Sequence, residues 1–137
     1  MVMQIRTEAE KFKDITGVYL PNLLISLYEK RGNGGFGPKY GMLGIVEGHK
    51  TDLGDSMFSL YNSFNEKDPE DPNWIWPREL VPFIHLGCAI HLCIDTSHPT
   101  LRIIEFDPNG DGPGEKLAEH FREYCPSFEE WINANVQ

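Results

Sequence analysis

The sequence has no long hydrophobic run and few cysteines. Its apolar stretches stay far below the roughly 20 residues that a helix needs to cross a bilayer. Three cysteines in 137 residues do not make a disulfide scaffold, since their number is small and odd. The first fourteen residues, MVMQIRTEAEKFKD, lack the apolar region of a secretory signal peptide. We therefore expect a cytoplasmic protein.

Basic residues are also scarce. Twelve Lys and Arg stand against 21 Asp and Glu, for a formal net charge of −9. Nucleic acids and anionic membranes attract basic surfaces, so we expect neither as a partner. The charge suits a basic protein partner, and it also suits plain solubility. Hydrophobic residues make up 40% of the chain and aromatic residues 12%, which is enough for one core. Because of this composition and the length of the chain, we expect residues 1–137 to form a single domain.

A glycine-rich run is the most informative feature that the chain does contain. Its members are Asn33, Gly34, Gly35, Phe36, Gly37 and Pro38. Three glycines and a proline in six residues indicate positive φ angles and a fixed bend. The pattern before the run predicts a helix over residues 21–30 that stops at Gly32, and the pattern after it predicts a strand over 41–46. We expect the run to be a structural motif that orients these two elements.

The same run imitates a nucleotide-binding fingerprint. Gly32, Gly34 and Gly37 satisfy the letters of G-x-G-x-x-G. That fingerprint works between a preceding strand and a following helix, whose N-terminus receives the pyrophosphate. Here a predicted helix precedes the run and a predicted strand follows it. The reversed order favours a turn over a nucleotide site.

The remaining patterns predict an α+β fold with one mixed, largely antiparallel sheet flanked by helices. Apolar residues recur at helical spacing in some segments, and in others short apolar runs are separated by turn residues. Further helices are predicted over residues 8–15, 52–64, 114–124 and 128–135. Strands are predicted over residues 80–86, 88–95 and 100–106, as an antiparallel meander.

Two segments imitate metal sites. Asp107, Asn109 and Asp111 fit the start of a calcium loop, but the twelfth position is Ala118 where the loop needs a bidentate carboxylate. We expect an Asx-rich turn there instead. In the second segment, His85, Cys88, His91 and Cys93 lie within nine residues.

Strand geometry argues against zinc in that second segment. Alternation places His91 and Cys93 on one face of a strand and Cys88 on the other, so the four side chains do not converge. We expect Cys88 to be a small buried apolar residue, and we expect no metal or cofactor. No Cys–His pair is marked out by spacing either, so a small hydrolase or metal enzyme is the least favoured reading.

An acidic segment followed by two tryptophans is the candidate partner-binding site. The residues are Glu66, Asp68, Glu70, Asp71, Trp74 and Trp76. Carboxylates steer basic partners, and tryptophans often anchor interfaces. A solvated loop, with the tryptophans covering the sheet, is an equally good interpretation.

Several segments in order resemble one known family. They are LPNLLISLYEKRGNGGFGPKYGMLGIV, TDLGDSMFSLY, NWIWPRELVPFIHLGCAIHLCID, FDPNG and SFEEWI. The series spans residues 20–132 and resembles the SUKH superfamily, typified by the fungal Smi/Knr regulators of cell-wall synthesis. One departure is Ala89, where a glycine commonly follows the Gly-Cys pair.

The resemblance implies a non-enzymatic α+β domain. Bacterial members are similar to immunity proteins, which bind and neutralise toxins, often nucleases. We therefore expect an immunity protein with a basic toxin domain as its partner. The alternative is a regulatory or scaffolding interaction protein of the Smi/Knr type.

Overall fold

The computed structural model describes residues 2–66, 69–72, 74–109 and 117–136. Its elements, in chain order, are α1 (Val2–Thr16), α2 (Asn22–Arg31), α3 (Met57–Asn65), β1 (Leu80–Gly87), β2 (Ile90–Asp95), β3 (Ile103–Phe106), a 3-10 turn η1 (Leu117–His120), β4 (Phe121–Cys125) and α4 (Phe128–Asn135). None of the described helices is long and apolar enough to span a bilayer.

The four described strands form one antiparallel sheet in the order β1-β2-β3-β4. The predicted α+β class and the meander of the first three strands are confirmed. Cys88 and Ala89 connect β1 to β2, and both have positive φ angles, of 54° and 63°. Two such residues in succession are typical of a tight hairpin turn. Glycine adopts a positive φ angle more readily than alanine. This accounts for the glycine that commonly stands at this position in the family that the sequence resembles.

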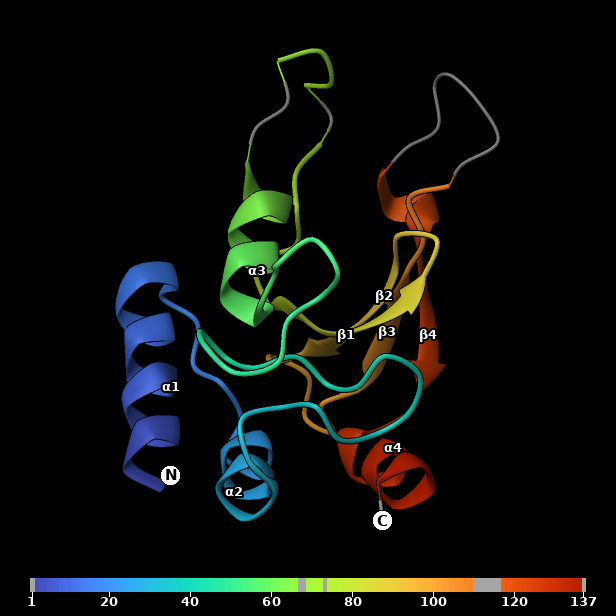
Figure 1. Cartoon of the computed structure of the whole chain (residues 1–137). Coiled ribbons are helices and arrows are strands. Elements are labelled where there is room, and N and C mark those ends of the chain that lie inside the picture. Colours follow the sequence, from blue (N-terminus) through green and yellow to red (C-terminus); the bar gives the residue numbers. More distant parts are fainter. Residues whose placement is uncertain (1, 67–68, 73, 110–116, 137) are drawn as a thin grey trace.

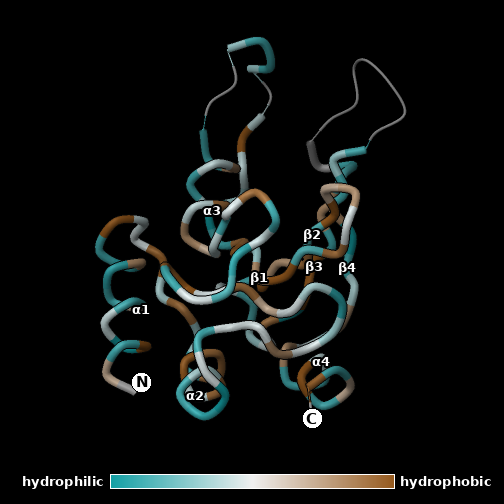
Figure 2. The backbone as a smooth tube through the Cα atoms, viewed as in Figure 1, coloured by the Kyte–Doolittle hydropathy of each residue, from teal (hydrophilic) through white to brown (hydrophobic). Residues whose placement is uncertain are grey.

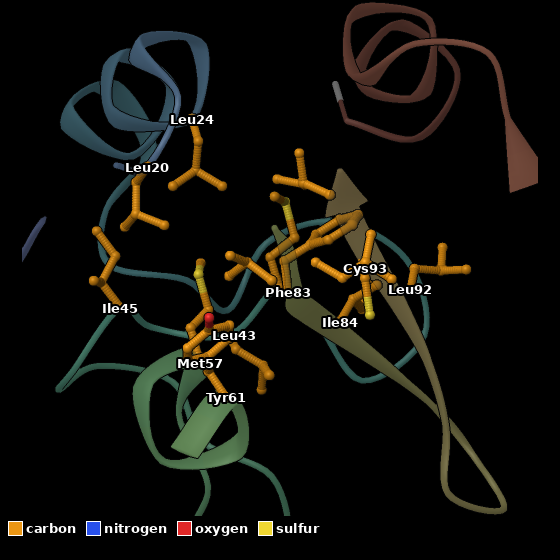
Figure 3. Close-up of a cluster of buried hydrophobic side chains, with 14 of the residues drawn as sticks. Leu20, Leu24, Leu43, Ile45, Met57, Tyr61, Phe83, Ile84, Leu92 and Cys93 are labelled. Atoms are coloured by element: carbon orange, nitrogen blue, oxygen red, sulfur yellow. The ribbon is translucent and has the colours of Figure 1, made fainter. Parts of the chain in front are cut away.

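The core lies where the helices meet the sheet. Leu24 of α2 and Met57 of α3 point toward Phe83 of β1 in the same cluster (Figure 3). α4 adds Trp131, whose ring lies 4.9 Å from that of Phe83 in an edge-to-face contact. Figure 2 shows hydrophobic residues along β1 and hydrophilic residues on the segment that follows α3. The core therefore joins α2, α3 and α4 to β1.

Two predicted helices start elsewhere. α1 begins at Val2, six residues before the predicted start, because Ile5 adds another buried position to the stripe of Ala9 and Phe12. α3 begins at Met57, five residues after the predicted start. Ser56 caps it, since its hydroxyl accepts from the Ser59 amide and the Ser59 hydroxyl accepts from the Ser56 amide.

The predicted strand over residues 41–46 is wrong. Only an isolated bridge between Met42 and Ile84 forms there. The Leu43 amide bonds to the Phe83 carbonyl at 2.8 Å, but the next amide, of Gly44, turns back to the His49 carbonyl at 2.7 Å. The backbone therefore leaves the edge of the sheet after one contact.

The predicted helix over residues 114–124 is also wrong. Residues 114–116 lie outside the described residues, residues 117–120 form η1, and the rest of the segment is β4. Phe121 explains the change, because its ring lies 5.1 Å from Phe106 and 5.3 Å from Trp76. Pairing with β3 thus buries an aromatic side chain that an exposed helix would leave in water.

Candidate functional site

A groove of about 440 Å³ opens where α3 ends. The described residues that line it come from α3, the segment after it, and the sheet: Ser63, Phe64, Glu66, Trp74, Ala89, His91, Phe106 and Pro108. The end of α3 and the β1–β2 turn lie toward the upper end of the molecule in Figure 1, away from α2 and α4. Most of the wall is aromatic or apolar, and Glu66 supplies a carboxylate at its rim.

Hydrogen bonds fix the wall that follows α3. The Trp74 indole N–H donates to the Phe64 carbonyl at 2.8 Å, and the Tyr61 hydroxyl donates to the Arg78 carbonyl at 2.6 Å. The Trp76 indole N–H donates to the Leu80 carbonyl at 2.9 Å. Each bond satisfies a polar atom of an aromatic side chain that is wholly or partly buried. The segment from residue 74 to 80 is therefore held against α3 and the start of β1.

The two tryptophans have different environments. Trp76 is buried and packs against Phe64, Phe106 and Phe121 at ring distances of 4.7, 4.9 and 5.3 Å. Trp74 is only partly buried and lies 5.8 Å from Phe106 at the mouth of the groove. Trp76 is therefore a core residue, which fits the alternative interpretation that the tryptophans cover the sheet. Trp74 keeps a surface that a partner can reach.

His91 forms part of the groove floor from β2. Its ring packs edge-to-face on Phe64 at 5.3 Å and lies 4.8 Å from the ring of His85. Its Nδ1 lies 3.0 Å from the Ala89 carbonyl oxygen. Burial, with a smaller contribution from His85, lowers the pKa of His91 to about 4. The floor of the groove is therefore uncharged at neutral pH.

Of the predicted acidic residues, one is shown at the groove. Glu66 lines it, while Glu70 and Asp71 lie in the segment between α3 and Trp74, where the Asp71 carbonyl accepts from the Trp74 amide at 3.1 Å. Asp68 lies outside the described residues. The structure thus brings Glu66 and Trp74 together at one groove, and their role in binding stays a prediction.

The acidic residues are concentrated in the second part of the chain, and this uneven distribution did not enter the sequence analysis. Residues 51–137 carry 16 acidic and five basic side chains, for a net charge of −11. Residues 1–50 carry five acidic and seven basic side chains, for a net charge of +2. The groove therefore belongs to the strongly acidic part of the chain, which contains α3, the sheet and α4.

Phe64, His91 and Phe106 were not predicted as site residues. They come from α3, β2 and β3, which are far apart in sequence. His91 carried the best local signal, since a histidine stands there between the apolar residues of a strand. Such a position is more often a packed core histidine than a site residue, and only the fold places it in the groove.

The glycine-rich run forms a turn, as predicted. Gly34 and Gly35 have φ angles of 85° and 87°. The Gly35 amide donates to the Met42 carbonyl at 2.7 Å, and the Asn33 side-chain oxygen accepts from the Ile45 amide at 2.9 Å. α2 precedes this turn and no helix follows it before α3. The order required for a dinucleotide site is absent from the described residues.

The remaining members of the run also serve packing. The Phe36 ring lies 5.3 Å from that of Tyr28, which is fully buried and whose hydroxyl donates to the Leu43 carbonyl at 2.6 Å. A Cβ on Gly37 would lie 3.3 Å from the Met42 side chain, and the Pro38 carbonyl accepts from the Gly41 amide at 3.0 Å. The run thus positions α2 against residues 42–45.

The described part of the calcium-like segment is an Asx turn. The Asp107 side chain accepts from both the backbone amide and the side-chain amide of Asn109, at 2.9 and 3.0 Å. The Asn109 side chain also donates to the Cys88 carbonyl at 2.7 Å, which ties the turn to the β1–β2 hairpin. Asp111 lies outside the described residues.

The zinc-like residues do not form one ligand cluster, although the rings of His85 and His91 lie 4.8 Å apart. Cys88 is exposed in the hairpin turn, so its prediction as a buried residue is wrong; the turn displaces it from the strand face. Cys93 is the buried cysteine, and burial raises the pKa of its thiol. Among the residues that the structure describes, no three His, Cys, Asp or Glu side chains are grouped to hold a metal ion.

Comparison with known proteins gives one result. No curated protein and no solved structure matches the chain. Residues 7–134 match a family model, described as the SMI1 / KNR4 family (SUKH-1). The match covers nearly the whole chain, in agreement with the resemblance in the sequence segments and with the α+β fold. The chain belongs to the SMI1 / KNR4 family.

Proposed function

We propose that this protein is a non-enzymatic binding domain that acts as an immunity protein against a basic toxin domain. The groove beside Trp74, with Glu66 at its rim and Glu70 and Asp71 in the loop that follows α3, is the contact surface. The observation that carries the proposal is the placement of Glu66 and Trp74 at one apolar groove. Interfaces combine apolar anchors with charged rims in this way.

Electrostatics supports a basic partner. The net charge of −9, with −11 over residues 51–137, which supply the described groove residues, gives the protein a negative field. A positively charged protein is steered into such a field and associates faster than a neutral one. Toxins that act on nucleic acid carry basic surfaces for their own substrate, so the acidic groove and a nuclease domain are complementary.

The chemistry of the groove supports binding over catalysis. Ser63, Glu66 and His91 all line it, but no hydrogen bond links any two of them among the described residues. A serine nucleophile needs a base within hydrogen-bond reach. His91 instead has its Nδ1 beside the Ala89 carbonyl and its ring against Phe64.

Toxin neutralisation tests the proposal directly. The genes beside the gene for this protein are searched for a toxin domain, which is then produced in a host with and without this protein while growth and complex formation are measured. We expect growth to be restored and a stable complex to be isolated. Loss of growth with no complex, together with capture of a host enzyme by the purified protein, would support the regulatory alternative instead.

A further inference from the structure

We infer that the groove receives one bulky apolar side chain from a positively charged segment of a partner protein. This inference rests on the proposed function and specifies what its contact surface recognises. The anchor lies over the ring of Phe64, beside Trp74, and its flanking lysines or arginines lie toward Glu66. The size and lining of the groove, its rigidity and its charge each support one part of this inference.

The apolar part follows from size and lining. A groove of about 440 Å³ falls in the range that holds a small ligand, and a large side chain fits within it. Phe64 and Trp74, both partly exposed, present ring surfaces to it, and the buried Phe106 lies beneath them. An aromatic or aliphatic side chain displaces water from these surfaces, at about 25 cal/mol per Å² of apolar area removed from water.

The groove is held ready for such a side chain. The hydrogen bond from the Trp74 indole N–H to the Phe64 carbonyl orients the indole. Its ring centroid lies 6.5 Å from that of Trp76 and 5.8 Å from that of Phe106, and these two neighbours restrict its movement. A side chain that is already ordered loses little entropy on binding. Fixed tryptophans in partly enclosed sites are typical binding hot spots.

The positive charge of the partner follows from what surrounds the apolar wall. Glu66 is exposed at the rim, and it makes none of the ion pairs formed among the described residues. Glu70 and Asp71 follow it in the same segment. His91 adds no positive charge at neutral pH, so nothing in the groove floor repels a cation. An acidic segment would meet a field of its own sign and be repelled.

Short synthetic peptides provide the test. One peptide carries a single tryptophan flanked by lysines; a second has alanine in place of the tryptophan, and a third has glutamates in place of the lysines. Binding is followed through the indole N–H signals of the protein in NMR spectra, with Trp74, Trp76 and Trp131 assigned by substitution. We expect a saturable shift of the Trp74 signal with the first peptide alone.

A substitution that fills the groove tests the same inference against a matched control. Ser63 is an exposed residue of α3 that lines the groove, so Ser63→Trp occupies it without removing a core contact. Ser26 is an exposed serine of α2, away from the groove, and Ser26→Trp is its control. We expect Ser63→Trp to weaken peptide binding about tenfold or more and Ser26→Trp to leave it unchanged. Ser63→Lys serves as a second variant, since an added positive charge must also weaken binding.

Specific results would overturn the inference. One is a shift of the Trp74 signal that is equally large with the alanine peptide or the glutamate peptide as with the first peptide. Another is the lack of a saturable shift with any peptide. A third is unchanged peptide binding by both Ser63 variants. A toxin complex that forms normally with Ser63→Trp would also count against the groove while leaving the immunity function standing. Failure of the wild-type protein to bind the toxin would count against the function itself.

Discussion

Glu8 and Asn33 are joined by a hydrogen bond of 2.9 Å, from the Asn33 side-chain amide to Glu8 Oε1. The same oxygen accepts from the backbone amides of Val46 and Glu47, each at 2.9 Å. Burial alone would raise the pKa of Glu8, but these hydrogen bonds outweigh it and the pKa is lowered. One carboxylate of α1 thus holds the glycine-rich run and the loop beyond it.

Removing either partner should destabilise the fold. We expect Glu8→Ala and Asn33→Ala each to lower the free energy of unfolding by about 1–3 kcal/mol. Glu8→Ala leaves the amides of Val46 and Glu47 without their acceptor, and Asn33→Ala does the same to the amide of Ile45. The double variant should cost less than the two single variants combined. Urea denaturation measures all three. Glu10→Ala, at an exposed position of the same helix, is the control, and an equal loss there would contradict the assignment.

Two adjacent glycines should respond differently to alanine. Both have positive φ angles, but a Cβ on Gly34 would lie 2.6 Å from the Met42 carbonyl oxygen and 2.7 Å from the Gly44 amide nitrogen. A Cβ on Gly35 meets only the His49 side chain, at 3.7 Å. We expect Gly35→Ala to cost about 1 kcal/mol from its backbone angle, and Gly34→Ala to cost about 3 kcal/mol or more. Equal losses in chemical denaturation would show that φ alone matters.

His91 should make the fold sensitive to mild acid. Its pKa is about 4 in the folded protein and about 6.5 when unfolded, so the unfolded chain binds more protons between these values. Stability is therefore lost as the pH falls from 6.5 to 4, by up to about 3 kcal/mol. Unfolding measured across this range should show the loss in the wild type and a shallower slope in His91→Asn. An identical slope in both proteins would contradict this role.

Glu8 acts in a lower pH window. Its folded pKa lies below its ordinary value of 4.5, so its contribution is present above that value and disappears as the pH falls through the folded pKa. Glu8→Gln should therefore flatten the stability profile below pH 4.5 and leave the His91 window in place. A change confined to the higher window would assign the effect to another group.

Local patterns predicted the parts of the fold that depend on neighbouring residues. The second and last helices and the three-strand meander follow from spacing and turn residues alone. Local patterns did not predict β4, because its pairing with β3 and the packing of Phe121 on Trp76 are long-range contacts. Residues 41–46 look like a strand, yet the Val46 amide is used by Glu8, which lies 38 positions away.

The candidate site was predicted only in part, for the same reason. Glu66 and Trp74 stand close in sequence, and their charge and aromatic character were visible there. Phe64, His91 and Phe106 complete the groove from three separate elements. No spacing rule joins them, and the burial of Trp76 also depends on the fold.

The association rate of this protein with a basic toxin domain tests the central claim most directly. It is measured at low and high salt for the wild type and for the variant Glu66→Gln, Asp68→Asn, Glu70→Gln and Asp71→Asn. A control neutralises the exposed residues Glu10→Gln, Asp14→Asn, Glu129→Gln and Glu130→Gln, with the same change in net charge. We predict association about tenfold slower at low salt for the first variant, with a flatter salt dependence and nearly unchanged stability. A rate equal to that of the wild type, or an equal loss in the control, would contradict the account.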